Sequence, residues 1–88
     1  MPTIKEKMAN ALSLPREIAL DLPMVSAMGQ EEVTIENYKH LLEFTDKKIR
    51  VRTKVGVMVI EGEGLTLRQV TAEHLLVAGR LAGILFHE

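Results

Sequence analysis

The residues able to do chemistry are few and scattered along this 88-residue chain. Its histidines, His40, His74 and His87, lack the close spacing that places metal ligands on one helix or loop. Glu61 and Glu63 flank a glycine and could act as paired carboxylates, but no nucleophile or second acid lies nearby. We interpret them as solvated turn residues and predict a protein that is not an enzyme, with no catalytic residue, metal or cofactor.

Composition excludes further classes. The chain has no cysteine, which removes disulfides, zinc–thiolate sites and thiol nucleophiles together. A net charge of -1 provides no global field that would recruit nucleic acid or an anionic membrane. No apolar run approaches the roughly 20 residues of a transmembrane segment, and the amino terminus lacks the apolar stretch of a signal peptide. We therefore expect a cytoplasmic protein.

One row of cations has the spacing of a binding surface: Lys48, Arg50, Arg52 and Lys54. On a β-strand, alternate residues project from one face, so the row can hold phosphate, RNA or anionic lipid headgroups. Aromatic residues for base stacking are scarce, at 3% of the chain. Acidic residues that can pair with the row across strands lie on neighbouring runs: Glu36, Glu43 and Glu61. We interpret the row foremost as a solvated, charge-paired face, with anion or partner binding as the alternative.

The elements that position these residues change character at residue 24. Residues 3–13 carry apolar side chains four apart, which predicts an amphipathic helix. Pro15 ends the helix, and Pro23 punctuates the chain again. We therefore divide the chain into residues 1–23, an N-terminal helix and proline-bounded arm, and residues 24–88, a β domain.

Beyond residue 24, apolar and polar residues alternate, as in half-buried strands. Turn signals recur roughly every 8–12 residues, which is the spacing of short antiparallel strands. We predict a mainly β fold, an antiparallel β-meander of about six or seven short strands curled into a sandwich or roll. A β-solenoid is the alternative, since the strands are nearly evenly spaced. Within GVMVIEGEGLTL (56–67), Gly62 and Gly64 are predicted to form a tight hairpin turn, with Gly56 as an earlier turn glycine.

Three segments are apolar on both faces: 57–60, 75–78 and 84–86. A strand of this kind is buried on both faces, so in a small chain one face covers the core and the other meets a second subunit. Residues 81–86 contain no charged side chain, although charges usually protect a terminal strand at a sheet edge from pairing with another chain. We predict a homo-oligomer that associates through this edge across a two-fold axis. The alternative is that the N-terminal helix of the same chain covers the edge. The predicted edge residues are Leu75, Val77, Leu81, Ile84 and Phe86.

The sequence resembles the YabP/YqfC family of sporulation proteins, and its YqfC branch in particular, from about Leu14 to Phe86. The resemblance is carried by Gly29 and four motifs: LP-x-x-x-x-x-DLP at 14–23, IENYK at 35–39, G-x-x-x-I-x-G-x-x-L-x-L at 56–67 and L-x-V-x-G-x-L/I at 75–81. Ala78 stands where family members carry a glutamate before the last glycine.

The resemblance implies a protein of endospore-forming bacteria, made in the mother cell and needed for a proper spore, with no catalytic activity attached to the family. It also implies a larger, membrane-anchored sporulation partner. We therefore expect a self-associating assembly or scaffold module in the mother-cell cytoplasm, held at the forespore membrane through that partner. The alternative is a binding module that uses residues 48–54 for nucleic acid or anionic lipid.

Overall fold

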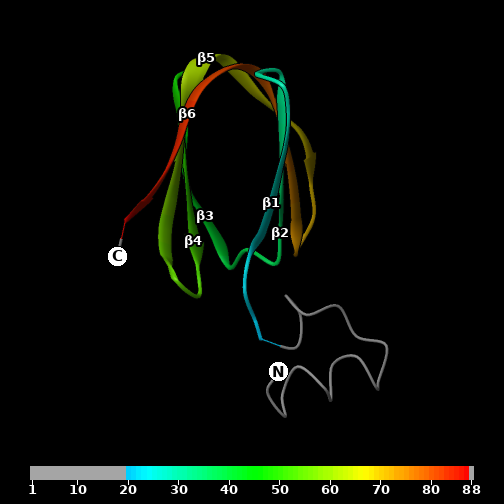
Figure 1. Ribbon diagram of the computed structural model, residues 1–88, viewed down its shortest axis with the longest axis vertical. Helices are drawn as coiled ribbons and strands as arrows, with labels where there is room; N and C mark the ends of the chain where they lie inside the picture. Colours follow the sequence, from blue (N-terminus) through cyan, green and yellow to red (C-terminus); the bar gives the residue numbers. More distant parts are fainter. Residues whose placement is uncertain (1–19, 88) are drawn as a thin grey trace, which may run out of the picture.

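The computed structural model describes residues 20–87, which form six β-strands and no helix. The strands are β1 (Met24–Met28), β2 (Glu32–Glu36), β3 (His40–Phe44), β4 (Lys48–Thr53), β5 (Gly56–Val70) and β6 (His74–His87). All neighbours are antiparallel in one sheet of order β1-β2-β6-β5-β4-β3 (Figure 1). The prediction of an antiparallel all-β fold is thus confirmed. The predicted helix over 3–13 lies outside the described residues.

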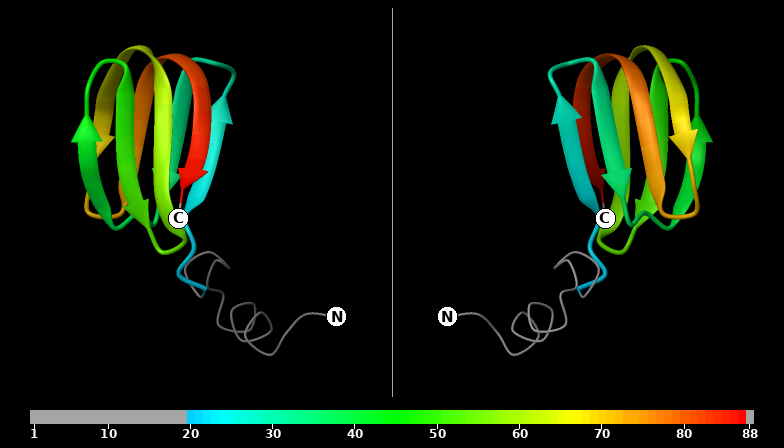
Figure 2. Two further views of the ribbon diagram at one scale, coloured as in Figure 1. Left: turned by 90° about the vertical axis from the view of Figure 1, so that its left-hand side faces the viewer. Right: turned by 90° about the vertical axis from the view of Figure 1, so that its right-hand side faces the viewer.

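Two long strands allow this single sheet to form two layers. β5 has 15 residues and β6 has 14, and both arch over at their middle (Figure 1). The β4 half-sheet consists of β3, β4, residues 56–61 of β5 and residues 83–87 of β6. The β2 half-sheet consists of β1, β2, residues 74–78 of β6 and residues 65–70 of β5. The two half-sheets face each other across the core (Figure 2).

The predicted meander is correct only in part. Strands β3 to β6 pair with their sequence neighbours, but β2 pairs with β6 and not with β3. The physical reason is the arch in β6, because its first half lies in the other layer, where β4 cannot reach it and β2 can. The prediction of uniformly short strands is wrong for the same reason, since β5 and β6 each serve both layers.

Glycines make the arch possible. A Cβ atom on Gly62 would lie 2.2 Å from the backbone oxygen of Arg80, and one on Gly79 would lie 2.7 Å from the backbone oxygen of Gly64. Gly64 and Gly79 also adopt positive φ angles of 61° and 142°. The predicted hairpin turn at Gly62 and Gly64 is therefore wrong. These glycines lie inside a continuous strand and allow two backbones to approach each other at the bend.

The core fills the space between the half-sheets. Its fully buried side chains come from both layers: Val33, Ile35, Ile49, Val51, Met58, Ile60, Leu65, Leu75 and Val77. On β4 the alternation is regular, because Ile49, Val51 and Thr53 are buried while the residues between them are not. The period-two pattern predicted for this strand is confirmed.

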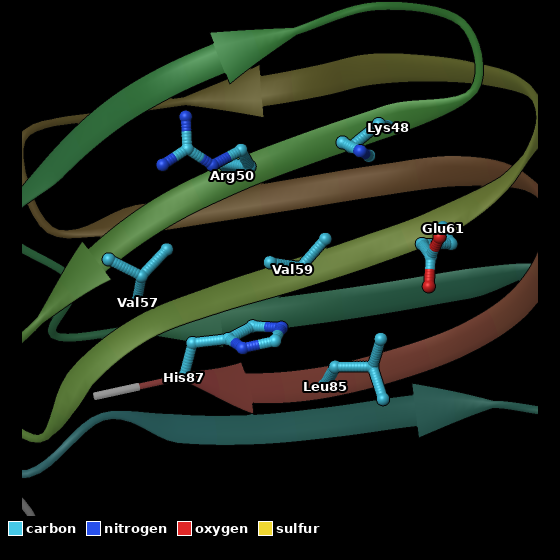
Figure 3. A pocket seen from close by; sticks show the side chains of 7 residues that line it. All are labelled: Lys48, Arg50, Val57, Val59, Glu61, Leu85 and His87. Carbon is cyan, nitrogen blue, oxygen red and sulfur yellow. The ribbon is translucent and has the colours of Figure 1, made fainter.

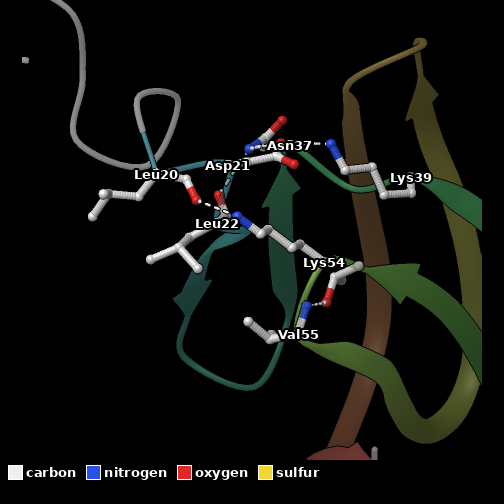
Figure 4. A network of polar contacts seen from close by, with 8 residues as sticks. Leu20, Asp21, Leu22, Asn37, Lys39, Lys54 and Val55 are labelled. Atoms are coloured by element: carbon white, nitrogen blue, oxygen red, sulfur yellow. Dashed lines mark hydrogen bonds and ion pairs between the residues drawn. The ribbon is translucent and has the colours of Figure 1, made fainter. Parts of the chain in front are cut away.

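A polar network ties the chain entering β1 to the other layer (Figure 4). The side-chain amide of Asn37 donates to the carbonyl oxygen of Leu22 at 3.0 Å and to Asp21 Oδ1 at 3.4 Å. The Lys39 ammonium forms an ion pair with the same carboxylate. Its hydrogen bond lowers the pKa of Asp21 below the ordinary value of 3.8. Asp21 and Leu22 of the motif at 14–23 thus meet Asn37 and Lys39 of the motif at 35–39 in space.

Candidate functional site

The cationic row lies on the outer face of the β4 half-sheet. Lys48 and Arg52 are exposed and Arg50 is half-buried, because inward-facing residues alternate with them along the strand. Lys54 lies beyond the end of β4, in the turn before β5. Its Nζ donates to the carbonyl oxygen of Leu20 at 3.3 Å (Figure 4). Three of the four predicted residues therefore share one strand face, and the fourth belongs to the polar network.

Acidic side chains flank this row on both neighbouring strands. Glu43 on β3 places Oε1 3.5 Å from Arg50 Nη1, and Glu61 on β5 stands directly opposite Lys48 in the strand register. The third predicted acidic partner, Glu36, lies on β2 in the other half-sheet, 3.8 Å from His74 Nδ1. The prediction of cross-strand charge pairing is supported for two acids and wrong for Glu36, because the arch separates β2 from β4.

An apolar ridge borders the row. The ridge consists of Val57 and Val59 of β5 and Leu85 of β6, which register places side by side. Together with charged neighbours the ridge lines a shallow cavity of about 350 Å³. Its lining residues are Lys48, Arg50, Val57, Val59, Glu61, Leu85 and His87 (Figure 3). On the outer face of the β4 half-sheet, the apolar ridge therefore spans β5 and the edge strand β6, with the cations of β4 along one side and Glu61 and His87 at its ends.

The ridge was not predicted as a neighbour of the cations. The signal was present in the runs 57–60 and 84–86, which are apolar on both faces. Met58 and Ile60 point into the core, so Val57 and Val59 remain for the outer face, where Val57 is half-buried and Val59 is 7% exposed. The sequence could not place them beside β4, because that requires the strand order.

The candidate chemical residues are far apart in the fold. His40 begins β3, His74 begins β6 and His87 ends β6. Within residues 20–87 there is no group of three or more metal-ligating side chains. Glu61 stands opposite Lys48 in the β4–β5 register, whereas Glu63 stands opposite Arg80 in the β5–β6 register at the bend. The two carboxylates therefore have different cationic neighbours and do not form a turn.

The residues predicted for a self-association edge divide into two groups. Leu75 and Val77 are fully buried and Leu81 is 8% exposed, so these three are core residues and present no side chain at a free surface. Ile84 is half-buried, and Phe86 is 57% exposed near the end of β6. The structure narrows the candidate edge to the last residues of β6 and adds Leu85, which is 46% exposed.

The fold and this face define a class of protein: a single antiparallel sheet folded into two layers, with a charge-bordered apolar ridge on one outer face. Among the described residues there is no helix long and apolar enough to cross a membrane. The model of the YabP family matches residues 23–88. The chain belongs to the YabP family, and the resemblance noted in its motifs is confirmed.

The chain is similar to the uncharacterized protein YqfC of Bacillus subtilis (strain 168). The two are 28% identical over 78 residues, which cover 89% of this chain and 84% of that protein. The motif positions have structural roles here. Ile35 and Ile60 are core residues, Gly62 lies at the bend, and Tyr38 is buried and donates its hydroxyl to the carbonyl oxygen of Thr71.

Proposed function

We propose that this protein is a non-enzymatic assembly module of sporulation, which acts in the mother-cell cytoplasm, self-associates and docks on a membrane-anchored partner. Membership of the YabP family supports the sporulation setting, because the resemblance to that family implies a role in spore formation. The observation that carries the docking role is the charge-bordered apolar ridge on the outer face of the β4 half-sheet.

The composition of this face favours a protein partner. Interfaces between proteins combine apolar residues with a polar, hydrated rim, and the ridge of Val57, Val59 and Leu85 has charged or polar residues along its β4 side and at its ends. Glu43 and Glu61 stand beside the cations and reduce the positive field that a polyanion requires. The lining residues include no Phe, Tyr or Trp on which a base can stack, and the imidazole of His87 is their one ring.

A charge placed in the ridge tests this role. Val57→Asp inserts a carboxylate into the middle of the docking face, where it must be desolvated when a partner binds. Leu76→Asp is the matched control. Like Val57, Leu76 is a half-buried aliphatic residue on one of the two long strands, but it lies on β6 within the β2 half-sheet. In a sporulating host that lacks the gene, we expect the wild type and Leu76→Asp to restore heat-resistant spores and Val57→Asp to fail.

Two readouts make the outcome decisive. Circular dichroism and urea unfolding establish that both variants are folded before their spore yields are compared. Affinity capture from sporulating membranes then shows whether a membrane-anchored protein is retained by Leu76→Asp and lost from Val57→Asp. Full restoration of spores by a folded Val57→Asp protein would contradict docking through the ridge.

The second candidate is a binding module for nucleic acid or anionic lipid. One observation favours it: Arg52 stands opposite His40 and Val57 in the two flanking strands, so no carboxylate faces it across the ladder. Binding of this kind weakens steeply with added salt. Titration of the protein with RNA and with acidic vesicles at two salt concentrations tests it, and indifference to both ligands would dismiss this candidate.

A further inference from the structure

One open side of the folded sheet carries two uncharged strand edges. β1 and the end of β6 lie on this side, and β3 and the end of β5 lie on the opposite side (Figure 2). Strand β1 reads MVSAM, and residues 83–86 of β6 read GILF. The opposite side carries charged side chains at its edges, such as Glu43 and Arg68. Charged side chains therefore discourage the addition of another strand on the β3 side, whereas none does so on the side of β1 and the end of β6.

The backbone of residues 83–87 pairs with a neighbouring strand on one side only. These residues pair with residues 57–61 of β5 without a register shift, and within residues 20–87 no strand pairs with their other side. Proline, lysine and bulges, with which proteins protect such edges, are missing from this stretch. The amide and carbonyl groups on that side have no backbone partner within residues 20–87, and another extended strand can satisfy both kinds in one ladder.

We propose that a second copy of this chain pairs with this edge, antiparallel, across a two-fold axis at Leu85. In an antiparallel pair built by a two-fold axis, opposed residues lie on the same face of the sheet. A residue a given number of positions before the axis is opposed to the partner's residue the same number of positions after it. An axis at Leu85 is the register that pairs all of residues 83–87. Leu85 then meets the partner's Leu85 on the outer face, and Ile84 meets the partner's Phe86 on the inner face.

The remaining pair in this register is also compatible. Gly83 stands opposite the partner's His87, and a Cβ atom at Gly83 would have no neighbour within 4 Å. The imidazole ring therefore has room above the glycine. Glu61 follows next, since it pairs with Gly83 on the other side. A carboxylate is a suitable hydrogen-bond acceptor for an imidazole N–H, so the only polar side chain of the segment finds a partner.

A pair through β1 is less favourable by the same reasoning. A two-fold axis at the middle of β1 would oppose Ser26 to the partner's Ser26, with Ala27 beside it. These central side chains bury little apolar surface, and the exposed apolar side chains of β1, Met24 at 44% and Met28 at 65%, stand at its two ends. In β6 the two central positions are Leu85 and Phe86, which are 46% and 57% exposed and point to opposite faces of the sheet. Pairing through β6 therefore places its exposed apolar side chains at the axis of the pair, whereas pairing through β1 places them at the strand ends.

This dimer rests on the self-association in the proposed function and specifies its geometry. The β4 half-sheets of two copies, with four strands each, become one continuous eight-stranded layer. Both outer faces then point to the same side of this layer, because the two-fold axis is perpendicular to it. The two apolar ridges join at Leu85, and the docking face for a partner doubles in length.

The absence of cysteine from the chain permits a direct test of the register. Opposed residues in an antiparallel ladder have Cα atoms about 4.5–5.5 Å apart, which a disulfide bond can span. Leu85→Cys should therefore form a covalent dimer under mild oxidation in most of the protein. Val70→Cys is the matched control, because Val70 is 53% exposed at the edge of β5 on the other open side. Equal cross-linking of both variants would overturn the proposed pairing.

A second variant tests the dimer without a covalent bond. The wild type should sediment at twice the chain mass of 9.8 kDa, and Leu85→Lys at that mass with an unchanged circular dichroism spectrum, because like charges then meet on the axis. Val70→Lys should remain dimeric. A wild type that is monomeric over a wide concentration range overturns the dimer alone. A dimeric protein whose Val57→Asp variant restores spores overturns the docking role alone.

Discussion

At the scale of single residues, the glycines at the bend have two distinct functions. A glycine is required at position 62 for steric reasons, because a Cβ atom there would clash with the backbone oxygen of Arg80. Gly64 is required by conformation, since its φ of 61° lies in the left-handed region although no atom lies within 4 Å of its Cβ position. Gly83 has neither restriction. These differences make the three glycines a graded series for mutation.

The prediction at this scale concerns the free energy of unfolding. Gly62→Ala should lower it by about 3 kcal/mol, because the new methyl group forces two strands apart at the bend. Gly64→Val should lower it by roughly 1–3 kcal/mol, through backbone strain at a β-branched residue. Gly83→Ala should change it by less than about 1 kcal/mol. Urea unfolding measures all three, and a Gly62→Ala protein as stable as the wild type would show that the bend is not closely packed.

At the scale of the strand, β4 separates a face that lines the core from the outer face for which we propose docking. Its inward residues Ile49 and Val51 are fully buried and belong to the core. Its outward cations lie between the acids of β3 and β5. The Arg50–Glu43 ion pair is open to water, with 43% and 40% of the two side chains exposed. Such pairs contribute little to stability, so we infer that they serve to tune the charge of the docking face.

This inference predicts different effects on stability and on charge. Glu43→Gln should change the free energy of unfolding by less than about 1 kcal/mol, because solvent screens the pair that is lost. If the cations bind an anionic ligand, the same variant should bind RNA or acidic vesicles more tightly than the wild type. Urea unfolding and a binding titration measure the two effects. A large loss of stability would mean that the pair is structural.

At the scale of the whole molecule, the Asp21 network connects the two half-sheets at the end opposite the bend. Asp21 precedes β1 of one half-sheet, and Lys39 precedes β3 of the other. Lys54, in the turn after β4, donates to the carbonyl oxygen of Leu20 in the same segment. The two half-sheets are therefore joined by covalent continuity at the bend, by the core between them and by polar contacts at the open end.

The network predicts a pH-dependent stability. The hydrogen bond from Lys39 lowers the pKa of Asp21 in the folded chain below its ordinary value of 3.8. A carboxyl group with a lowered folded pKa stabilises the protein at pH values above its unfolded pKa, and this contribution is lost as the pH falls through the folded pKa. The stability difference between the wild type and Asp21→Asn should therefore be largest near neutral pH and disappear in acid.

Urea unfolding at a series of pH values measures that difference. Asp46→Asn is the control for the loss of one negative charge, because Asp46 lies in the exposed turn between β3 and β4. This variant keeps the contact between Asp21 and Lys39 and gives the baseline for the removal of one carboxylate. A difference for Asp21→Asn that stays constant down to the acid limit would show that the ion pair does not stabilise the fold.

The sequence by itself determined the features that depend on neighbouring residues. Alternation assigned Ile49 and Val51 to the core and the cations between them to the outside, because side chains of a strand point to opposite faces in turn. The motifs also identified the family, since they record local requirements such as the buried Ile35. The predicted helix over 3–13 lies outside the described residues and stays a prediction.

Only the tertiary structure decided which strands meet. Whether Gly62 serves a turn or a bend depends on the approach of Arg80, which is distant in the sequence. Whether Leu75 faces a partner or the core depends on β2, which pairs with it only because β6 arches between two layers. A period-two pattern specifies the faces of a strand but not its neighbours. Burial and pairing are therefore settled by contacts between residues far apart in the chain.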